Sequence, residues 1–298
     1  MTPPAGRADG PPRPVAQAPR RRPDGKQRAV RRCIVQAAFL CALGSELASK
    51  LSYHEEEERA VADWLRIAHR GASGHAPENT LAAFRKAVEM GVDGIEMDIH
   101  LSADEEVVVL HDATLDRTTD AEGKVAHLSL AEIREADAGD GERVSTLAEA
   151  LAVIPRDILA FVEIKAIEAT PHAVRIVQEM DRLDQVVVIS FDPNTLRMLR
   201  QVDSRIPMAL LLGSGADDDV TASTLGIDLL RRAQATGTST VSVDWRLVTT
   251  EVVSDVRRRG GSVWTWTVNQ TDDIRRLASM GAQAITSDYP DRLNEARV

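Results

Sequence analysis

Residues 94–112 read GIEMDIHLSADEEVVVLHD, and side chains of two kinds alternate along the first part of this stretch. Successive side chains of a β-strand point to opposite faces, so one face of residues 94–101 carries Glu96 and Asp98 and the other carries only apolar groups. A strand of this kind buries its apolar face and presents its two carboxylates together. We therefore expect residues 94–101 to contribute acidic groups to a functional site.

The remainder of the stretch completes a hairpin. Residues 106–110 are apolar and largely β-branched, and only a short polar segment separates them from the first strand. A parallel crossover needs a dozen or more residues, so the two strands should be antiparallel. With a turn centred near residues 104 and 105, His111 is expected opposite roughly Asp98. The hairpin would then gather Glu96, Asp98 and His111 in one region.

Length and charge limit the classes of protein that the chain can form. Its 298 residues can bury a full core, and 43% hydrophobic with 28% charged residues are typical of a globular protein. The formal net charge of −10 argues against nucleic acid as the main partner. Only Cys33 and Cys41 are present, which excludes a disulfide framework or a thiolate metal site.

The N-terminal extension, residues 1–44, differs from the rest of the chain. Residues 1–32 are rich in Pro and contain nine Lys or Arg against two Asp, a charge of +7 that leaves −17 for residues 33–298. We expect this tail to be disordered and to touch an anionic membrane surface weakly at most. The apolar run at 33–43 fits either an ordinary helix start or a signal or anchor. We prefer the ordinary helix start, which predicts a cytoplasmic protein. Residues 45–65 are predicted to continue as an amphipathic helix.

From Leu65 onward, strand and helix patterns alternate. Strands are predicted at 65–69, 94–101, 158–165, 186–191, 206–212, 240–244, 262–268 and 284–287. Helices are predicted at 79–90, 146–153, 170–183, 193–201, 223–235, 249–259 and 271–280. Eight strands alternating with helices predict an α/β fold of the (β/α)₈ (TIM) barrel type, over one domain at 45–298. Residues 113–145 are the one long departure, and we interpret them as a small insertion after the hairpin.

His69 and Arg70 end the first predicted strand, where the loops of a barrel carry function. A guanidinium fork can bind two phosphate oxygens, and an imidazole can transfer a proton. A salt-bridged structural pair would give the same two residues. On these residues alone, both interpretations stay open.

Glu163 and Lys165 end the third barrel strand, and their parity turns both toward the barrel axis if Val162 and Ile164 face the helices. Glu163 would then join Glu96 and Asp98. Three converging carboxylates repel one another unless a cation is present, and all-oxygen ligation selects Mg²⁺ or Ca²⁺. The alternative is that Glu163 and Lys165 only pair with each other.

Trp264 and Trp266 lie on one face of the strand at 262–268. Trp266 is closer to the C-terminal end, where it could form a wall of a substrate pocket. Trp264 is deeper and is expected in the core.

Several motifs together resemble the glycerophosphodiester phosphodiesterase family. They are HRGASGHAPENT, GIEMDIHLS, VVVLHDATLDRTT, STLAEAL, FVEIK, VISF, WTWTVN and ITSDYPD, and they occur in the family's order over residues 66–293. The resemblance implies a (β/α)₈ barrel that hydrolyses glycerophosphodiesters to glycerol 3-phosphate and an alcohol with one divalent cation. It further implies metal ligation by Glu96, Asp98 and Glu163, acid and base roles for His69 and His111, and phosphate contacts from Arg70 and Lys165.

The resemblance leaves two alternatives to this activity. One is a lysophospholipase D-type reaction on lysolipids, which needs an apolar groove for acyl chains. The other is a non-catalytic protein that binds anionic surfaces, against which the complete set of histidines and carboxylates argues. A small-molecule phosphodiester is the expected partner.

Overall fold

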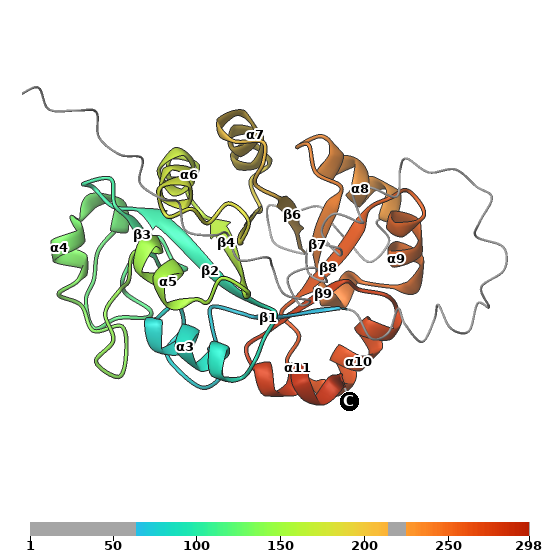
Figure 1. The fold of residues 1–298 in the computed structure, drawn as a ribbon, viewed down its shortest axis with the longest axis horizontal. Coiled ribbons are helices and arrows are strands. Elements are labelled where there is room, and N and C mark those ends of the chain that lie inside the picture. The colour runs from blue at the N-terminus through green and yellow to red at the C-terminus, as the bar shows by residue number, and fades with distance from the viewer. Residues whose placement is uncertain (1–63, 214–224, 298) are drawn as a thin grey trace, which may run out of the picture.

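The computed structural model describes residues 64–213 and 225–297. Within these ranges eight parallel strands form a barrel with helices on its outside, and a ninth strand pairs antiparallel at its edge (Figure 1). The strands are β1 (Leu65–Ala68), β2 (Gly94–Leu101), β3 (Val107–Val109), β4 (Leu159–Ile164), β5 (Val186–Ser190), β6 (Met208–Leu212), β7 (Thr240–Asp244), β8 (Ser262–Trp266) and β9 (Ala284–Ser287).

Helices connect the strands in the order that the sequence pattern predicts. They are α3 (Leu81–Glu89), α4 (Leu130–Ile133), α5 (Leu147–Val153), α6 (Ala169–Glu179), α7 (Pro193–Val202), α8 (Gly226–Gln234), α9 (Thr250–Arg257), α10 (Thr271–Ser279) and α11 (Pro290–Ala296), with 3₁₀ turns η1 (Val125–His127) and η2 (Trp245–Leu247). Helix α11 was not predicted, although Pro290 at its first turn is a helix-start signal.

The barrel closes because β1 pairs with both β9 and β2. Going round the barrel, the order is β1-β9-β8-β7-β6-β5-β4-β2, and every neighbouring pair is parallel. The (β/α)₈ barrel predicted from the sequence is therefore confirmed. Parallel strands all end at the same side, so the residues that follow them meet there.

The alternation along β2 has the predicted result. Ile95, Met97 and Ile99 are fully buried in the apolar layer between the strands and the helices. Glu96 and Asp98 point the other way and are also buried. On β4, Val162 and Ile164 belong to the outer layer, whereas Phe161 packs inside the barrel against Trp264. Burying one such phenylalanine contributes roughly 2 kcal/mol.

The hairpin of β2 and β3 is antiparallel as predicted, but its register differs by one residue. Ile99 pairs with Val109, and the Leu110 N–H donates to the Asp98 carbonyl at 3.0 Å, so position 98 faces 110 rather than 111. The turn is centred on residue 104, whereas the prediction had centred it between residues 104 and 105. Ser102 pairs with Glu106 across a three-residue loop in which Glu105 has a positive φ of 64°.

The segment after β3 has a small apolar core of its own. Its buried members are Val108, Leu110, Leu115, Val125, Ile133, Ala136, Ala138 and Val144. A capping box of Ser129 and Glu132 starts α4, and a second box of Thr146 and Glu149 starts α5 as the chain re-enters the barrel. The segment is thus packed against the hairpin end that carries His111.

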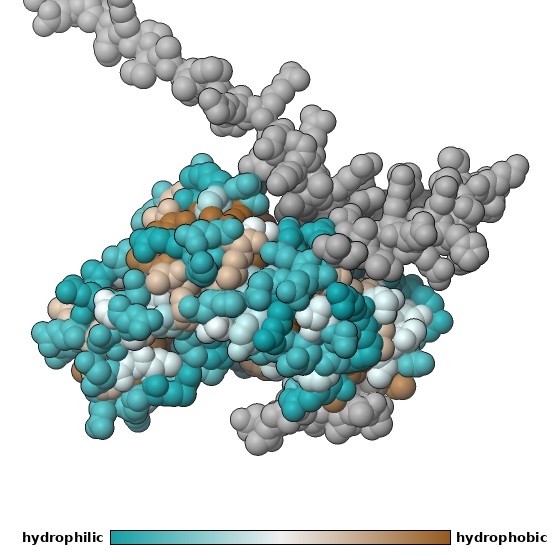
Figure 2. Space-filling model, turned by 90° about the horizontal axis from the view of Figure 1, so that it is seen from below, coloured by the Kyte–Doolittle hydropathy of each residue, from teal (hydrophilic) through white to brown (hydrophobic). Residues whose placement is uncertain are grey.

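The predicted tail at 1–32, the apolar run at 33–43 and most of the predicted helix at 45–65 lie outside the described residues. Of the helices that are described, none combines the length and the apolar character needed to cross a bilayer. Figure 2 shows one face of the molecule, on which hydrophilic residues predominate and hydrophobic ones gather in one area.

Candidate active site

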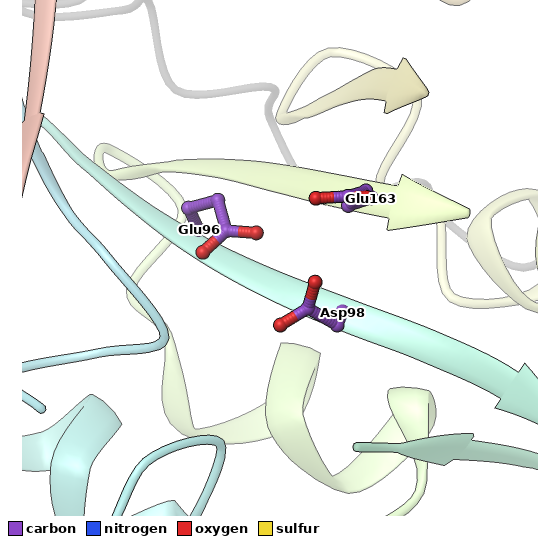
Figure 3. Close-up of side chains that lie close together, drawn as sticks. All are labelled: Glu96, Asp98 and Glu163. Atoms are coloured by element: carbon purple, nitrogen blue, oxygen red, sulfur yellow. The ribbon is translucent and has the colours of Figure 1, made fainter. Parts of the chain in front are cut away.

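Three carboxylates converge inside the barrel near the C-terminal ends of β2 and β4. Asp98 is paired with Glu163 across the two strands, and Glu96 lies two residues earlier on β2. Each residue offers an oxygen that lies within 4.8 Å of the other two, and all three side chains are buried. Figure 3 shows the three carboxylates directed toward one another. Among the described residues, this is the one group of three or more such side chains close enough to hold a metal ion together.

The charges of this acidic cluster are only partly balanced. Burial and the adjacent Asp98 and Glu163 raise the pKa of Glu96, and burial with Asp98 raises the pKa of Glu163 to about 7. Burial also opposes ionisation of Asp98, but the charges of Arg70 and Lys165 outweigh it and lower the pKa. Asp98 Oδ1 is buried and has no hydrogen-bond partner among the described residues. The donor set therefore fits a hard divalent cation.

The loop after β1 folds back over β2 and supplies Arg70. The Arg70 N–H donates to Glu96 Oε2 at 2.8 Å, and its guanidinium lies 3.3 Å from Asp98 and donates to Glu78 at 2.9 Å. Gly71, at φ +79°, follows where a Cβ would stand 2.7 Å from the backbone of Ala83. The tight loop thus aims the Arg70 guanidinium at the acidic cluster.

Asn79 belongs to the same loop, directly before the residue that caps the next helix. Thr80 caps α3, whereas Asn79 donates to Asp98 Oδ2 at 2.9 Å and accepts from the Asp98 N–H at 3.2 Å. This pair of bonds holds the Asp98 carboxylate in place.

His69 lies directly after β1, 4.0 Å from Glu96 through Nε2. Its other ring nitrogen, Nδ1, contacts Asp288 Oδ1 at 2.6 Å. Asp288 also accepts from Ser73 at 3.0 Å and from Asn269 at 2.6 Å. Burial opposes ionisation of Asp288, but the contacts with His69, Asn269 and Ser73 together outweigh it, and the pKa falls to about 2. The imidazole is therefore held by a carboxylate on one side and faces the acidic cluster on the other.

His111, after β3, has the same arrangement. Its Nδ1 lies 2.6 Å from Asp112 Oδ1, and its Nε2 lies 3.2 Å from Lys165 Nζ. Burial lowers the pKa of His111. Because an ammonium can only donate, His111 Nε2 accepts in this contact, and the ring is neutral with its proton on Nδ1.

Lys165 connects His111 with the acidic cluster. Its Nζ donates to Glu163 Oε1 at 2.8 Å and lies 3.6 Å from Asp98 Oδ1. Glu163 and Lys165 do form an ion pair, as the alternative interpretation of the sequence expected. The pair is not isolated, because it also belongs to the larger group of charged side chains in the site. Burial lowers the pKa of Lys165, and the nearby Glu163 and Asp98 carboxylates more than compensate and raise it.

Trp266 lies at the same end of the barrel as these groups. Its indole Nε1 donates to the Ser242 carbonyl at 3.1 Å, and its ring meets Phe191 edge-on with centroids 5.4 Å apart. Phe191 is 43% exposed and lies 6.0 Å from Lys165 Nζ. The two rings form an aromatic wall beside the charged groups.

A cavity of about 310 Å³ opens at the opposite end of the barrel. Residues at the N-terminal ends of the strands line it, among them Val187, Met208, Thr240 and Ser262, with Phe161 and Trp264 from the interior. The predicted site residues lie at the other end, so this cavity is not the candidate active site.

The structure brings all the predicted site residues to one end of the barrel. It also adds residues that the sequence analysis did not assign to the site: Glu78, Asn79, Asp112, Arg117, Phe191, Asn269 and Asp288. Asp288 directly follows β9, and the pairing of β1 with β9 brings it to His69.

Comparisons with known proteins point to one family. The model of the glycerophosphoryl diester phosphodiesterase family matches residues 69–292. A glycerophosphodiester phosphodiesterase of Caldanaerobacter subterraneus subsp. tengcongensis is 33% identical over 242 residues, which are 77% of this chain and 96% of that protein. Human glycerophosphodiester phosphodiesterase 1 is 37% identical over 157 residues, 48% of this chain and 47% of its own.

Solved structures agree with the sequence matches. A phosphodiesterase of Oleispira antarctica, in complex with the product sn-glycerol-3-phosphate, superposes with a TM-score of 0.69 at 28% identity, covering 78% of this chain and 96% of that one. A glycerophosphodiester phosphodiesterase of Thermotoga maritima superposes with a TM-score of 0.65 at 25% identity, covering 78% and 97%.

Proposed function

Because the chain belongs to the glycerophosphoryl diester phosphodiesterase family, we propose that it hydrolyses glycerophosphodiesters to glycerol 3-phosphate and an alcohol. The observation that carries the proposal is the acidic cluster together with two histidines, His69 and His111, each held by a carboxylate. The product bound to the Oleispira antarctica relative supports the choice of substrate.

The chain's own residues can bind and activate a phosphodiester. Arg70 and Lys165 are cations at the edge of the acidic cluster, suited to the anionic phosphate. Glu96, Asp98 and Glu163 would hold one divalent cation, Mg²⁺ or Ca²⁺. When bound, such a cation balances the carboxylate charges and stabilises the charge on the phosphoryl oxygens.

Two proton transfers remain, and we assign them to His69 and His111. One histidine takes the proton of the nucleophile and the other gives a proton to the departing alkoxide. The nucleophile is either water or the free glycerol hydroxyl of the substrate, and the second route passes through a cyclic phosphate. Detection of cyclic glycerol phosphate by ³¹P NMR during turnover would identify the second route.

The test of the function uses the wild-type protein stripped with a chelator. Glycerophosphocholine is supplied with Mg²⁺, with Ca²⁺ or with neither, and glycerol 3-phosphate is measured. We expect release only after a cation is restored. Choline release with a preference for lysophosphatidylcholine would instead indicate a lysophospholipase D-type activity, and no turnover with any cation or head group would refute the proposal.

A further inference from the structure

The guanidinium of Arg117 joins two carboxylates that come from different parts of the chain. Its Nε and Nη2 donate to Asp112 at 2.7 and 3.0 Å, and its Nη1 and Nη2 donate to Glu78 at 3.0 and 2.8 Å. All three nitrogens are therefore used, in two forks that share Nη2. Glu78 and then Asp112 raise the pKa of Arg117, and the charge of the guanidinium is permanent in any case.

Each of the two carboxylates also holds a group of the candidate active site. Asp112 Oδ1 contacts His111 Nδ1 at 2.6 Å, and Glu78 Oε1 accepts from Arg70 Nη1 at 2.9 Å. A continuous chain of charge-assisted contacts thus runs from His111 through Asp112, Arg117 and Glu78 to Arg70.

Only an arginine can complete this connection. Forks to two carboxylates need several donors in one rigid plane, whereas a lysine ammonium offers a point charge on a flexible stem. Asp112 needs such an anchor because it adjoins His111 in the chain and is itself on a loop. Arg117 lies in the segment after β3, which has its own core, so it is attached to a packed unit.

We propose that Arg117 is a positioning residue that sets the orientation of His111 and the placement of Arg70 together. The inference rests on the proposed function for the roles of those two groups. Through Arg117, the segment after β3 would contribute to catalysis, because it fixes the imidazole of His111 relative to the guanidinium of Arg70. Arg117 is 46% exposed in its side chain, so its contribution lies in geometry rather than in the stability of the fold.

The test compares Arg117→Ala with Arg134→Ala. Arg134 belongs to the same segment and forms an ion pair with Glu149 at 2.6 Å, away from the site, so it is a matched control. We expect Arg117→Ala to lower kcat/KM roughly 100-fold through both a lower kcat and a higher KM, because misplacement of reacting groups has effects of that size. Arg134→Ala should keep the wild-type constants.

Three further measurements separate positioning from loss of structure. Added guanidinium should restore part of the kcat of Arg117→Ala and nothing in Arg134→Ala. Arg117→Lys keeps the charge without the forks and should stay close to Arg117→Ala; it also decides the matter if the alanine variant does not fold. In ¹⁵N NMR spectra, the ring proton of His111 should reside on Nδ1 in the wild type and be redistributed in Arg117→Lys.

The outcomes distinguish this inference from the proposed function. A wild type that hydrolyses glycerophosphodiesters, together with unchanged constants in Arg117→Ala or Arg117→Lys, would overturn the positioning role alone. A wild type without turnover would overturn the proposed function. Even if the wild type shows no turnover, an unchanged ¹⁵N spectrum of His111 in Arg117→Lys would overturn the positioning role.

Discussion

His69 Nδ1 lies 2.6 Å from Asp288 Oδ1, although 219 positions separate the two residues in the chain. The contact exists because β1 and β9 are neighbours in the barrel, with Ala68 paired to Ser287. Each residue simply follows its strand at the same end. Asp288 is fixed in turn by Ser73 and Asn269, so its carboxylate can hold the histidine ring in one tautomer.

Asp288→Asn should therefore impair catalysis without unfolding the protein. The amide keeps the size of the side chain but can present its NH₂ to Nδ1, which favours the wrong tautomer of His69. We expect kcat to fall roughly 10²- to 10⁴-fold. Steady-state kinetics measure the loss. Asp291→Asn is the control, because Asp291 contacts His75 instead, and equal losses in the two variants would contradict the role of Asp288.

The same contact shows what the sequence can and cannot predict. Alternation along residues 94–101 and 158–165 was sufficient to place Glu96, Asp98 and Glu163 inside the barrel, since strand parity is a local property. Asp288 and Asn269 required knowledge of which strands become neighbours on closure. The contacts of Arg117 with Asp112 and Glu78 depend on the path of a loop. Loops lack the regular spacing of apolar residues from which strands and helices are predicted.

The hairpin register is a smaller example of the same limit. Alternation predicted the pairing of the two strands, but the register depends on the conformation of one turn residue, Glu105, at positive φ. A glycine there would have been a recognisable signal, whereas glutamate is not. His111 nevertheless reaches the site because it lies beyond the paired part of β3.

Without a cation, the contribution of the acidic cluster to the free energy of unfolding should fall as the pH rises from about 5 to about 7. Burial and Asp98 raise the pKa of Glu163 from 4.5 to about 7, and that of Glu96 moves the same way. The folded protein then binds protons that the unfolded chain has released, so this stabilisation is complete below pH 4.5 and is lost as the pH rises through about 7. At about 1.4 kcal/mol per pKa unit, this shift corresponds to a contribution from Glu163 of roughly 3 to 4 kcal/mol.

Chemical denaturation in a chelator across this pH range measures the effect. Saturating Mg²⁺ or Ca²⁺ should stabilise the protein more at high pH than at low pH, because the ligands must be deprotonated to bind. Glu163→Gln provides the control, with a flatter profile in chelator and a weaker response to the cation. If the metal-free wild type loses no more stability toward pH 7 than Glu163→Gln does, the acidic cluster is not protonated as described.

Trp266→Ala should raise KM roughly 10-fold and leave kcat within a few-fold of the wild type, since the aromatic wall would bind substrate away from the reacting atoms. Trp264 provides the contrast. It is partly buried and packs against Phe161 inside the barrel, so Trp264→Ala should lower stability by roughly 2 to 3 kcal/mol with an unchanged KM of the folded enzyme. Kinetics and thermal unfolding of both variants separate the two roles; an unaltered KM in Trp266→Ala would remove Trp266 from the substrate site.

The two histidines should differ in which proton they move. His111 Nε2 accepts from Lys165 and is therefore unprotonated, as a general base requires. His69 instead has carboxylates near both ring nitrogens, Asp288 at 2.6 Å from Nδ1 and Glu96 at 4.0 Å from Nε2, an arrangement suited to a general acid. A glycerophosphodiester whose alcohol is p-nitrophenol tests this assignment of acid and base. Its leaving group departs as a stable anion and needs no proton from a general acid. Both His69→Ala and His111→Ala should lose turnover of glycerophosphocholine roughly 10²- to 10⁴-fold while remaining folded. On the p-nitrophenyl ester, His69→Ala should recover most of its rate and His111→Ala should not, whereas the reverse pattern would exchange the two roles.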